Sequence, residues 1–348
     1  MGHDWLIGKQ LGAYHIQSKL GEGGMAQVYK AYHERLHREV AIKVILSQYA
    51  SQADYRTRFE HEAQAIAKLQ HRNIVAVYDF WEAGNMTYLA MQYVTGGTLR
   101  DLLRGGRSVE PQLAALYALQ IARALHHAHS HGIIHRDVKP ENVLMSSTNS
   151  NELLLSDFGL ARLFEERQKA AFLSTSQENA NMLSHSGQVL GTPYYMAPEQ
   201  IRGQAVDART DVYALGVVLF EMLTGMRPFQ ADNPLALYYQ HVYTLPKSVR
   251  EINPAVPMVL EQITTRALAK APEERYQSAD AMAQALKAAL VPQSTTSSLV
   301  VDAPPRYKRL LQSLLRPTTI ATILIIVILI VQFLVKLGIL HWSGIGTP

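Results

Sequence analysis

The sequence contains no cysteine among its 348 residues. Disulfide bonds, thiolate nucleophiles and cysteine-ligated zinc are therefore excluded, and thiol redox chemistry with them. A chain without cysteine also fits a reducing cytosol. The chemistry of this protein must come from other side chains.

The net charge of the chain is also small. The formal value is +4, and all of it arises beyond residue 300, so residues 1–300 are neutral. A balanced body beside a short basic segment predicts no nucleic-acid partner and favours contact with a membrane surface. The basic residues of that segment are Arg306, Lys308, Arg309, Arg316 and Lys336, against a single acidic residue, Asp302.

Long apolar runs are missing except for one. The first 20 residues hold no apolar segment of the signal-peptide kind, and Leu6 stands where a myristoylation signal needs Ser or Thr. Residues 318–335 carry no charge, and as a helix they would extend ~27 Å, close to the ~30 Å of a bilayer core. A buried core helix is the alternative, but this run follows a linker and has no obvious core to enter. We expect a transmembrane helix over 318–336.

The flanking charges give that helix a direction. More basic residues precede it than follow it, which places the N-terminal side in the cytoplasm. We therefore expect a single-pass protein of the cell membrane, with a linker at 291–317 and a short outer tail at 337–348.

The remaining chain predicts an α+β protein with two lobes. Residues 14–45 and 74–91 show the alternation of short strands, and residues 54–69 between them have helical spacing. Long helical patterns follow at 111–129 and 210–223, the second almost wholly apolar. With a hinge at Gly96 and Gly97, we expect a small β-rich lobe with one helix over 1–95 and a larger, mainly α lobe over 96–290.

The glycine-rich stretch "LGEGGMAQVYK" occupies residues 20–30. Glycines such as Gly21 and Gly23 let backbone N–H groups approach phosphate oxygens without a Cβ in the way. Such turns also join strands for purely structural reasons, so this stretch alone predicts little.

A second signal is Lys43 in "VAIK", a strand lysine that Glu62 on the following helix could hold against nucleotide phosphates. A surface salt bridge is the alternative for that pair.

Two further motifs, "HRDVKPEN" (135–142) and "LLLSDFGLA" (153–161), crowd charged and amide groups together. Transfer of a terminal phosphoryl group needs metal ligands, a positive clamp and a group that orients the nucleophile. We assign Asp137 to orienting the hydroxyl and taking its proton, and Lys139 to neutralising the phosphoryl group. Asn142 and Asp157 are the expected Mg²⁺ ligands through oxygen.

Together these motifs resemble eukaryotic-type protein kinases, and they occur in the order of that family from Leu11 to Ala283. "GTPYYMAPEQ" (191–200) is similar to the end of the family's activation loop, and "DVYALGVVLFEMLTG" (211–225) to its central buried helix. The resemblance implies a two-lobed kinase fold that phosphorylates proteins, itself included, with ATP and Mg²⁺, or Mn²⁺ in its place.

The details resemble bacterial serine/threonine kinases with one membrane helix. Lys139 and Thr192 are typical of the serine/threonine class, and "GEGGMA", "VAVYD" and "GGTLRDLL" are similar to the bacterial members. A homodimer is implied by the same analogy. We expect protein substrates and a membrane-anchored signalling role.

The resemblance also implies roles for individual residues. Thr192 contacts Asp137 and Lys139 and completes the catalytic group with Asn142. Met91 is the gatekeeper, Gln92 and Val94 read the adenine edge through the main chain, and Glu199 pairs with Arg275. His135 belongs, with Ile66 and Phe158, to a packed regulatory column. The implied nucleotide contacts are Leu20, Gly21, Gly23, Val28, Ala41, Lys43, Glu62, Gln92, Val94, Leu144 and Asp157.

Ser184 and Ser186 are the preferred phosphorylation sites in the polar segment that ends at Glu199, because they precede Thr192 by the spacing seen in bacterial relatives. Arg136 is the expected partner of the added charge. The alternative is that this loop is simply rich in serine.

Other functions stay open at this point. Ala26 replaces the third glycine of the glycine-rich loop, and we still expect activity. The tract "HHAHSH" (126–131) resembles a metal-binding sequence but coincides with the end of a helix. A pseudokinase scaffold and a membrane-tethered adaptor are the competing function classes, although the residues of the catalytic motifs are all present.

Overall fold

The computed structural model describes residues 6–22, 26–45, 63–83, 86–146, 151–158 and 193–291. All of them fall within one structural unit, Met1–Pro292. Within these ranges no helix combines the length and the apolar character needed to cross a membrane. Several predicted features lie outside the described residues, namely Gly23, Glu62, Ser184, Ser186, Thr192, the linker beyond residue 291, the 318–336 helix and the 337–348 tail.

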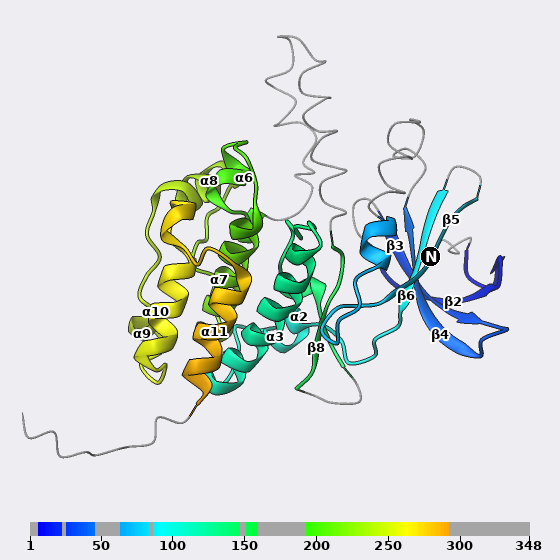
Figure 1. Ribbon diagram of the computed structural model, residues 1–348, viewed down its shortest axis with the longest axis horizontal. Coiled ribbons are helices and arrows are strands. Elements are labelled where there is room, and N and C mark those ends of the chain that lie inside the picture. The colour runs from blue at the N-terminus through cyan, green and yellow to red at the C-terminus, as the bar shows by residue number, and fades with distance from the viewer. Residues whose placement is uncertain are drawn as a thin grey trace, which may run out of the picture. The chain divides into compact units, whose positions relative to one another are not determined.

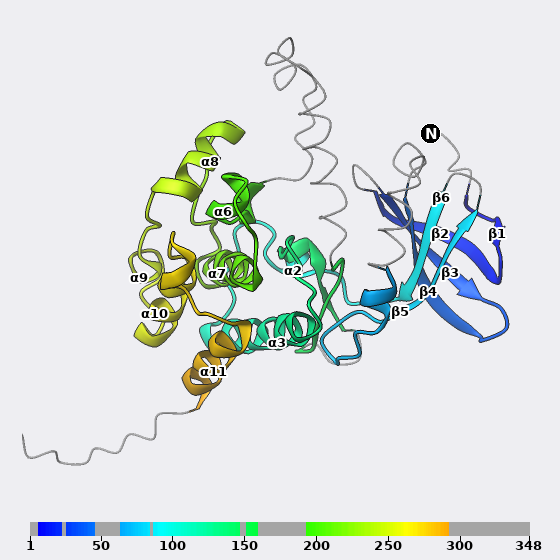
Figure 2. The ribbon, with the colours of Figure 1, turned by 45° about the horizontal axis from the view of Figure 1, so that its top comes forward.

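An antiparallel sheet of six strands forms the first lobe (Figures 1 and 2). Its spatial order is β1-β2-β3-β4-β6-β5, so that β6 inserts between β4 and β5. The strands are β1 (Gln10–Leu11), β2 (Tyr14–Glu22), β3 (Ala26–His33), β4 (Arg38–Ile45), β5 (Val77–Ala83) and β6 (Met86–Gln92).

Strand β4 contributes functionally different side chains to the two faces of this sheet. Val40, Ile42 and Val44 are buried in the core on one face. Because successive side chains of a strand point to opposite faces, Ala41 and Lys43 lie on the other face. The alternation thus places a lysine near a small apolar residue, on the face where Lys43 reaches a partner from the second lobe.

The second lobe is mainly helical (Figure 1). Its helices pack around α7, which contacts α3, α10 and α11. The helices are α2 (Leu99–Leu102), α3 (Pro111–Ser130), α6 (Pro198–Ile201), α7 (Ala208–Thr224), α8 (Pro234–Tyr243), α9 (Val249–Ile252), α10 (Met258–Ala267) and α11 (Ala279–Leu290), with 3₁₀ turns η2 (Pro140–Asn142), η3 (Pro193–Tyr195) and η4 (Pro272–Glu274) and a hairpin of β7 (Val143–Met145) and β8 (Leu153–Leu155).

Helix α7 is buried on all sides between residues 210 and 223. The Asp207 carboxylate caps its first turn by accepting from the Arg209 N–H at 2.8 Å, and Gly225 ends it with a φ of 73°. Gly216 lets α10 approach closely, since a Cβ there would come within 2.8 Å of the Cβ of Ala267. The apolar run of the sequence therefore forms the centre of the lobe.

The predicted hinge lies between the sheet and α2. Gly97 has a φ of 79°, and a Cβ on Gly96 would lie only 2.1 Å from the carbonyl oxygen of Met145. Glycine is needed at both positions, for the left-handed backbone at one and for the close approach at the other.

The predicted α+β architecture with two lobes is confirmed. Residues 14–45 contain the whole of β2, β3 and β4, and the helical patterns at 111–129 and 210–223 correspond to α3 and α7. Residues 63–67 are helical within the predicted 54–69 segment, whose earlier part lies outside the described residues. The later group of strands begins at Val77, because Ile74 makes only an isolated bridge.

Candidate active site

The loop between α3 and β7 carries Asp137, Lys139 and Asn142. The Lys139 Nζ lies 2.6 Å from Asp137 Oδ2. The Asn142 Nδ2 donates to the same oxygen at 3.0 Å and to the Asp137 carbonyl at 2.8 Å, because η2 folds the chain back at this point. An ammonium and an amide thus hold the aspartate, while its carboxylate stays 40% exposed and open to a substrate.

This loop is anchored by Asp211 in the first turn of α7. The buried Asp211 carboxylate accepts from the backbone N–H groups of His135 and Arg136, both at 2.8 Å, and lies 2.7 Å from His129 Nε2. Arg136 has a φ of 67°, which a residue other than glycine keeps only when its surroundings fix it. Sequence analysis missed this role of Asp211, although a carboxylate at the start of an apolar helix signals a buried partner.

The chain after β8 delivers Asp157 to the same place. The Ser156 N–H donates to the Asn142 carbonyl at 2.8 Å, which brings the backbone of the two predicted metal ligands, Asn142 and Asp157, together. Asp157 has a φ of 63° and accepts from Lys43 Nζ at 2.8 Å. The expected partner of Lys43 was Glu62, which lies outside the described residues. The structure thus gives Lys43 an anionic partner, Asp157, that was not predicted.

Charge decides the protonation of Asp157. Burial by itself would raise its pKa, but the neighbouring positive charge of Lys43 and the hydrogen bond from it outweigh burial and lower the pKa below the ordinary value. The ammonium of Lys139 acts in the same direction. The Asp157 carboxylate is therefore ionised at neutral pH, the state in which oxygen ligands bind Mg²⁺.

His135 has a structural role in this site. Its Nδ1 accepts from the Asp137 N–H at 3.2 Å, so Nε2 carries the proton and donates to the Ser156 carbonyl at 2.8 Å. The Phe158 ring packs against the imidazole with centroids 4.6 Å apart. Ile66 and Phe158 are both buried in the core cluster of the second lobe. His135 thereby ties the loop of Asp137 to the backbone that precedes Asp157.

An apolar cluster includes a residue of β4, the strand that carries Lys43. Ala41 and Met91 are buried in one cluster, and Val28, Val94 and Leu144 pack against it. Val28, Ala41, Val94 and Leu144 are predicted nucleotide contacts, and Met91 is the predicted gatekeeper. The cluster also contains Val75 and Leu154, which sequence analysis did not select because nothing in their neighbourhood distinguishes them from ordinary core residues.

The remaining predicted contacts of the nucleotide lie on β2 and at the end of β6. Gly21 stands opposite Val28 in the β2–β3 hairpin, and Leu20 is 45% exposed on the same strand. The Gln92 N–H donates to the Ala76 carbonyl at 2.8 Å. Val28 of the β2–β3 hairpin also packs against the apolar cluster.

The predicted pair of Glu199 and Arg275 is confirmed. The two guanidinium nitrogens donate to the two carboxylate oxygens at 2.7 and 2.8 Å, and both side chains are buried. Burial would raise the pKa of Glu199, but the hydrogen bonds and charge of Arg275 lower it. Thr210 Oγ1 adds a third hydrogen bond to Glu199, at 2.7 Å. The pair fastens α6 to the end of η4.

A second buried network was not predicted. Arg100 on α2 donates to Glu141 and to Glu221, both at 2.8 Å, and also to the Tyr195 hydroxyl. The Tyr195 hydroxyl in turn donates to Glu221 at 2.5 Å. Because these residues are spread over the sequence from position 100 to 221, no local pattern relates them. The network joins α2, the turn η2, η3 and α7.

The described residues contain no group of three or more histidine, aspartate or glutamate side chains that could hold a metal by themselves. In the tract "HHAHSH", His129 is committed to Asp211 and His127 stacks on His71 at 5.3 Å, so the tract is structural here. Asn142 and Asp157 together suit Mg²⁺, which takes few protein oxygens and completes its shell with phosphate and water.

A sheet-rich lobe, a helical lobe and a lysine–aspartate–asparagine–aspartate group between them define the class of phosphoryl-transfer enzymes that use a nucleotide. The family model for the protein kinase domain matches residues 14–290. The chain therefore belongs to the protein kinase family.

Individual relatives agree with this assignment. Serine/threonine-protein kinase PknB of Mycobacterium leprae is 42% identical over 273 residues, which are 77% of this chain and 42% of that protein. A crystal structure of the Mycobacterium tuberculosis PknI kinase domain is 27% identical with a TM-score of 0.61, covering 81% of this chain and 98% of that one. Rad53 1-466 in complex with AMP-PNP is 25% identical with a TM-score of 0.63, covering 78% of this chain and 64% of that one. The chain spans about two fifths of the length of the curated relatives it matches.

Proposed function

We propose that this protein is a serine/threonine kinase that transfers the γ-phosphoryl group of ATP, as its Mg²⁺ complex, to hydroxyl groups of protein substrates. The observation that carries the proposal is the meeting of two groups of polar side chains. Lys43 of the first lobe lies 2.8 Å from Asp157, and Lys139 and Asn142 contact the Asp137 carboxylate at 2.6 and 3.0 Å. The hydrogen bond from the Ser156 N–H to the Asn142 carbonyl joins the two groups through the backbone. Relatives named serine/threonine-protein kinases, at 37% to 42% identity, support the substrate class.

The charged residues have separate tasks. Asp137, the most open carboxylate of the group, orients the attacking hydroxyl and takes its proton. Lys139, beside it, neutralises the phosphoryl group in transit. Asn142 and Asp157 would hold Mg²⁺, which supplies charge neutralisation between the phosphates, and Lys43 would grip the phosphates nearer the base. Positioning and electrostatics account for most of the rate in such a site.

Adenine would lie against the apolar cluster at Val28, Ala41 and Leu144, beside Met91. Gln92 and Val94 would contact its edge through the main chain. The AMP-PNP complex of Rad53, a structural relative, supports nucleotide binding by this fold. Mg²⁺ is the expected ion, with Mn²⁺ as a substitute.

Regulation and location complete the proposal. We infer that the enzyme phosphorylates its own loop at Ser184 and Ser186 and that Thr192 contributes to serine/threonine selectivity. The 318–336 segment would anchor the protein in the cell membrane with the kinase in the cytoplasm, and a homodimer would favour phosphorylation between copies. The charge pattern and the apolar run of the sequence support this location.

The test uses the full-length protein in liposomes with labelled ATP and Mg²⁺, beside Asp137→Asn and Lys43→Met. We expect label on serine or threonine in the wild type alone, and mass spectrometry should find it at Ser184 and Ser186. Nucleotide binding without any label would favour a pseudokinase scaffold. Label equal in Asp137→Asn would contradict the assigned role of Asp137.

A further inference from the structure

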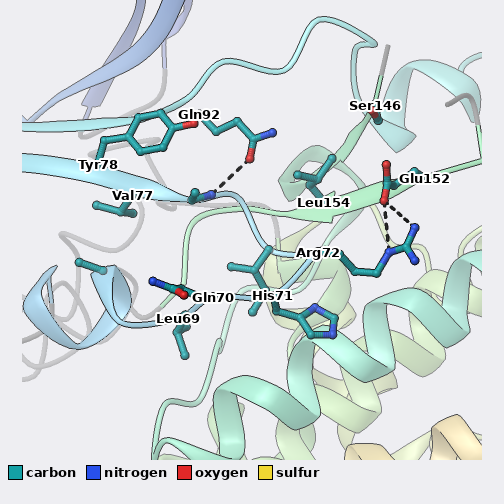
Figure 3. Close-up of a pocket in the computed structure, with 13 residues that line it drawn as sticks. Leu69, Gln70, His71, Arg72, Val77, Tyr78, Gln92, Ser146, Glu152 and Leu154 are labelled. Carbon is teal, nitrogen blue, oxygen red and sulfur yellow. Dashed lines mark hydrogen bonds and ion pairs between the residues drawn. The ribbon is translucent and has the colours of Figure 1, made fainter. Parts of the chain in front are cut away.

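A cavity of about 540 Å³ lies beside the hinge (Figure 3). Its walls are residues of the segment from Ala67 to Tyr78, the end of β6 at Gln92, and the β7–β8 hairpin at Ser146, Glu152 and Leu154. Small-molecule sites measure roughly 300–1,000 Å³, so this cavity has a suitable size. Lys43, Asp137 and Asp157 do not line it. The cavity is therefore separate from the charged side chains of the candidate active site.

The cavity combines an apolar wall with the side-chain amides of Gln70 and Gln92. Leu69, Ile74 and Leu154 are buried and form the apolar wall. The Gln92 side chain points into the cavity, and its Oε1 accepts from the Ala76 N–H at 3.5 Å, the long limit of a hydrogen bond (Figure 3). A side-chain amide offers a donor and an acceptor side by side. The complementary ligand group is another amide or a heteroaromatic edge.

The charges around the cavity cancel. Arg72 and Glu152 form an ion pair at 2.9 Å on its rim. The His71 ring is turned away from the cavity (Figure 3) and stacks on His127 of α3. Burial, followed by His127 and nearby arginines, lowers the pKa of His71, so the ring is neutral at pH 7. A neutral ligand therefore fits this site better than an ion.

Two residues belong to the cavity and to the proposed adenine site alike. Leu154 lines the cavity and packs in the cluster with Ala41 and Met91. Gln92 sends its side chain into the cavity, while its main chain lies on the strand that would read the adenine edge. A ligand that moves either residue acts on the nucleotide pocket as well, and such coupling is reciprocal.

We propose that this cavity is a regulatory binding site for a small neutral molecule with a flat apolar body and an amide or heteroaromatic edge, and that its occupation changes the affinity for nucleotide. The proposed binding is inferred from the geometry of the cavity alone. The proposed effect on nucleotide affinity depends on the proposed nucleotide site.

The binding test titrates the full-length protein with benzamide, nicotinamide and indole-3-carboxamide by ligand-observed NMR. We expect at least one of them to bind with a Kd in the millimolar range or tighter. Ala67→Phe and Ala76→Leu add bulk to the cavity wall from two positions, and each should weaken binding at least tenfold. Ala288→Phe, an exposed alanine on α11, is the matched control and should stay within twofold. Absence of binding by all three probes, or equal binding to the filled variants, would overturn the site.

Gln92→Leu tests the chemical class, because it removes the amide and keeps the main chain. This substitution should weaken the binding of the amide probes at least fivefold. Unchanged affinity would overturn the proposed hydrogen bond between the Gln92 side chain and the ligand. For the coupling, the Kd of AMP-PNP with Mg²⁺ should shift at least threefold when the cavity is saturated, and the shift should vanish in Ala67→Phe. A constant Kd would overturn the coupling alone. If AMP-PNP does not bind even without a probe, the proposed function fails, while the titration still decides the cavity.

Discussion

The Asp211 carboxylate on the central helix accepts the backbone N–H of Arg136 at 2.8 Å, and Arg136 precedes the proposed catalytic aspartate with a left-handed φ of 67°. A helix that is buried on all sides therefore fixes the backbone on which Asp137 sits. The position of the reactive carboxylate is determined in the second lobe, before any nucleotide arrives.

Asp211→Ala should weaken the fold and the reaction together. It leaves the N–H groups of His135 and Arg136 without this acceptor, and an unsatisfied buried donor costs about 1–3 kcal/mol. We expect a lower midpoint in urea and a kcat reduced by at least tenfold in phosphorylation assays. Asp207→Ala, which removes a helix cap and an exposed ion pair at the start of α7, is the control and should leave kcat nearly unchanged. Equal effects of the two variants would argue against a special role of Asp211.

Lys43→Met should abolish activity with little loss of stability. The Lys43 side chain is 14% exposed and paired with Asp157, so methionine keeps most of its volume and loses its charge. Lys30→Met breaks an ion pair with Glu39 on the neighbouring strand, where solvent screens the interaction, and should retain activity. Turnover of labelled ATP compares the two. Retained turnover in Lys43→Met would contradict the assigned phosphate contact.

Glu199→Ala should be among the most destabilising single changes. It leaves the fully buried Arg275 without its bidentate partner, and removing one member of a buried ion pair costs about 3–5 kcal/mol. The double variant Glu199→Leu with Arg275→Met should lose less stability than the sum of the losses in Glu199→Leu and Arg275→Met alone. Urea denaturation of the wild type, the single variants and the double variant measures this coupling. Additive losses would show that the two side chains act independently.

Stability should fall as the pH drops below the ordinary histidine pKa of about 6.5. Burial lowers the pKa of His71 and of His127, with His131 and His126 adding to the effect at His127. The unfolded imidazoles titrate near ~6.5, so below that pH the unfolded chain binds more protons than the folded one, and acid favours unfolding.

Thermal melts between roughly pH 7.5 and 5.5, which bracket that ordinary pKa, should show this loss. His127→Asn should make the Tm depend less on pH in that window. His15→Asn, at an exposed position in the first lobe, is the matched control and should follow the wild type. An identical pH dependence in His127→Asn and the wild type would count against the stacked pair as its source.

Arg100→Met should loosen the junction between η2, η3 and α7. Glu221 is 6% exposed and would lose its hydrogen bonds from Arg100, while Arg227 stays 3.6 Å away and limits the damage. We expect a loss of about 1–3 kcal/mol, as for a buried group left without a partner. Adding Glu221→Gln should restore part of the stability. Arg104→Met, which breaks only an exposed pair with Asp101, should stay within ~1 kcal/mol. Urea midpoints give the comparison, and similar losses in Arg100→Met and Arg104→Met would contradict the prediction.

Sequence reasoning reached the reactive residues because phosphoryl transfer demands rare residue types at short spacing. Asp137, Lys139 and Asn142 stand within one motif, and the structure joins them by direct hydrogen bonds. The two lobes followed from hydrophobic periodicity, which reports local structure well. The Glu199–Arg275 pair was reached only through resemblance to a family.

Sequence reasoning failed where distant segments meet. Asp211 lies 75 residues from Arg136, and Arg100 lies 121 residues from Glu221. The Gln92 side chain lines a cavity, a feature that the prediction of a main-chain contact for this residue did not include. Side-chain direction depends on tertiary packing, so neither composition nor periodicity could supply these three relationships.

Helix α7 sets the spacing between two charged networks. Asp211 near its start holds the loop of Asp137, and Glu221 near its end holds Arg100 and Tyr195. In an α-helix, ten residues correspond to ~15 Å of length, and one inserted residue shifts everything beyond it by ~1.5 Å and turns it by ~100°. A single insertion between the two carboxylates would misplace one network relative to the other even if every side chain were kept. The length of this helix is thus as much a part of the proposed enzyme as its charged groups.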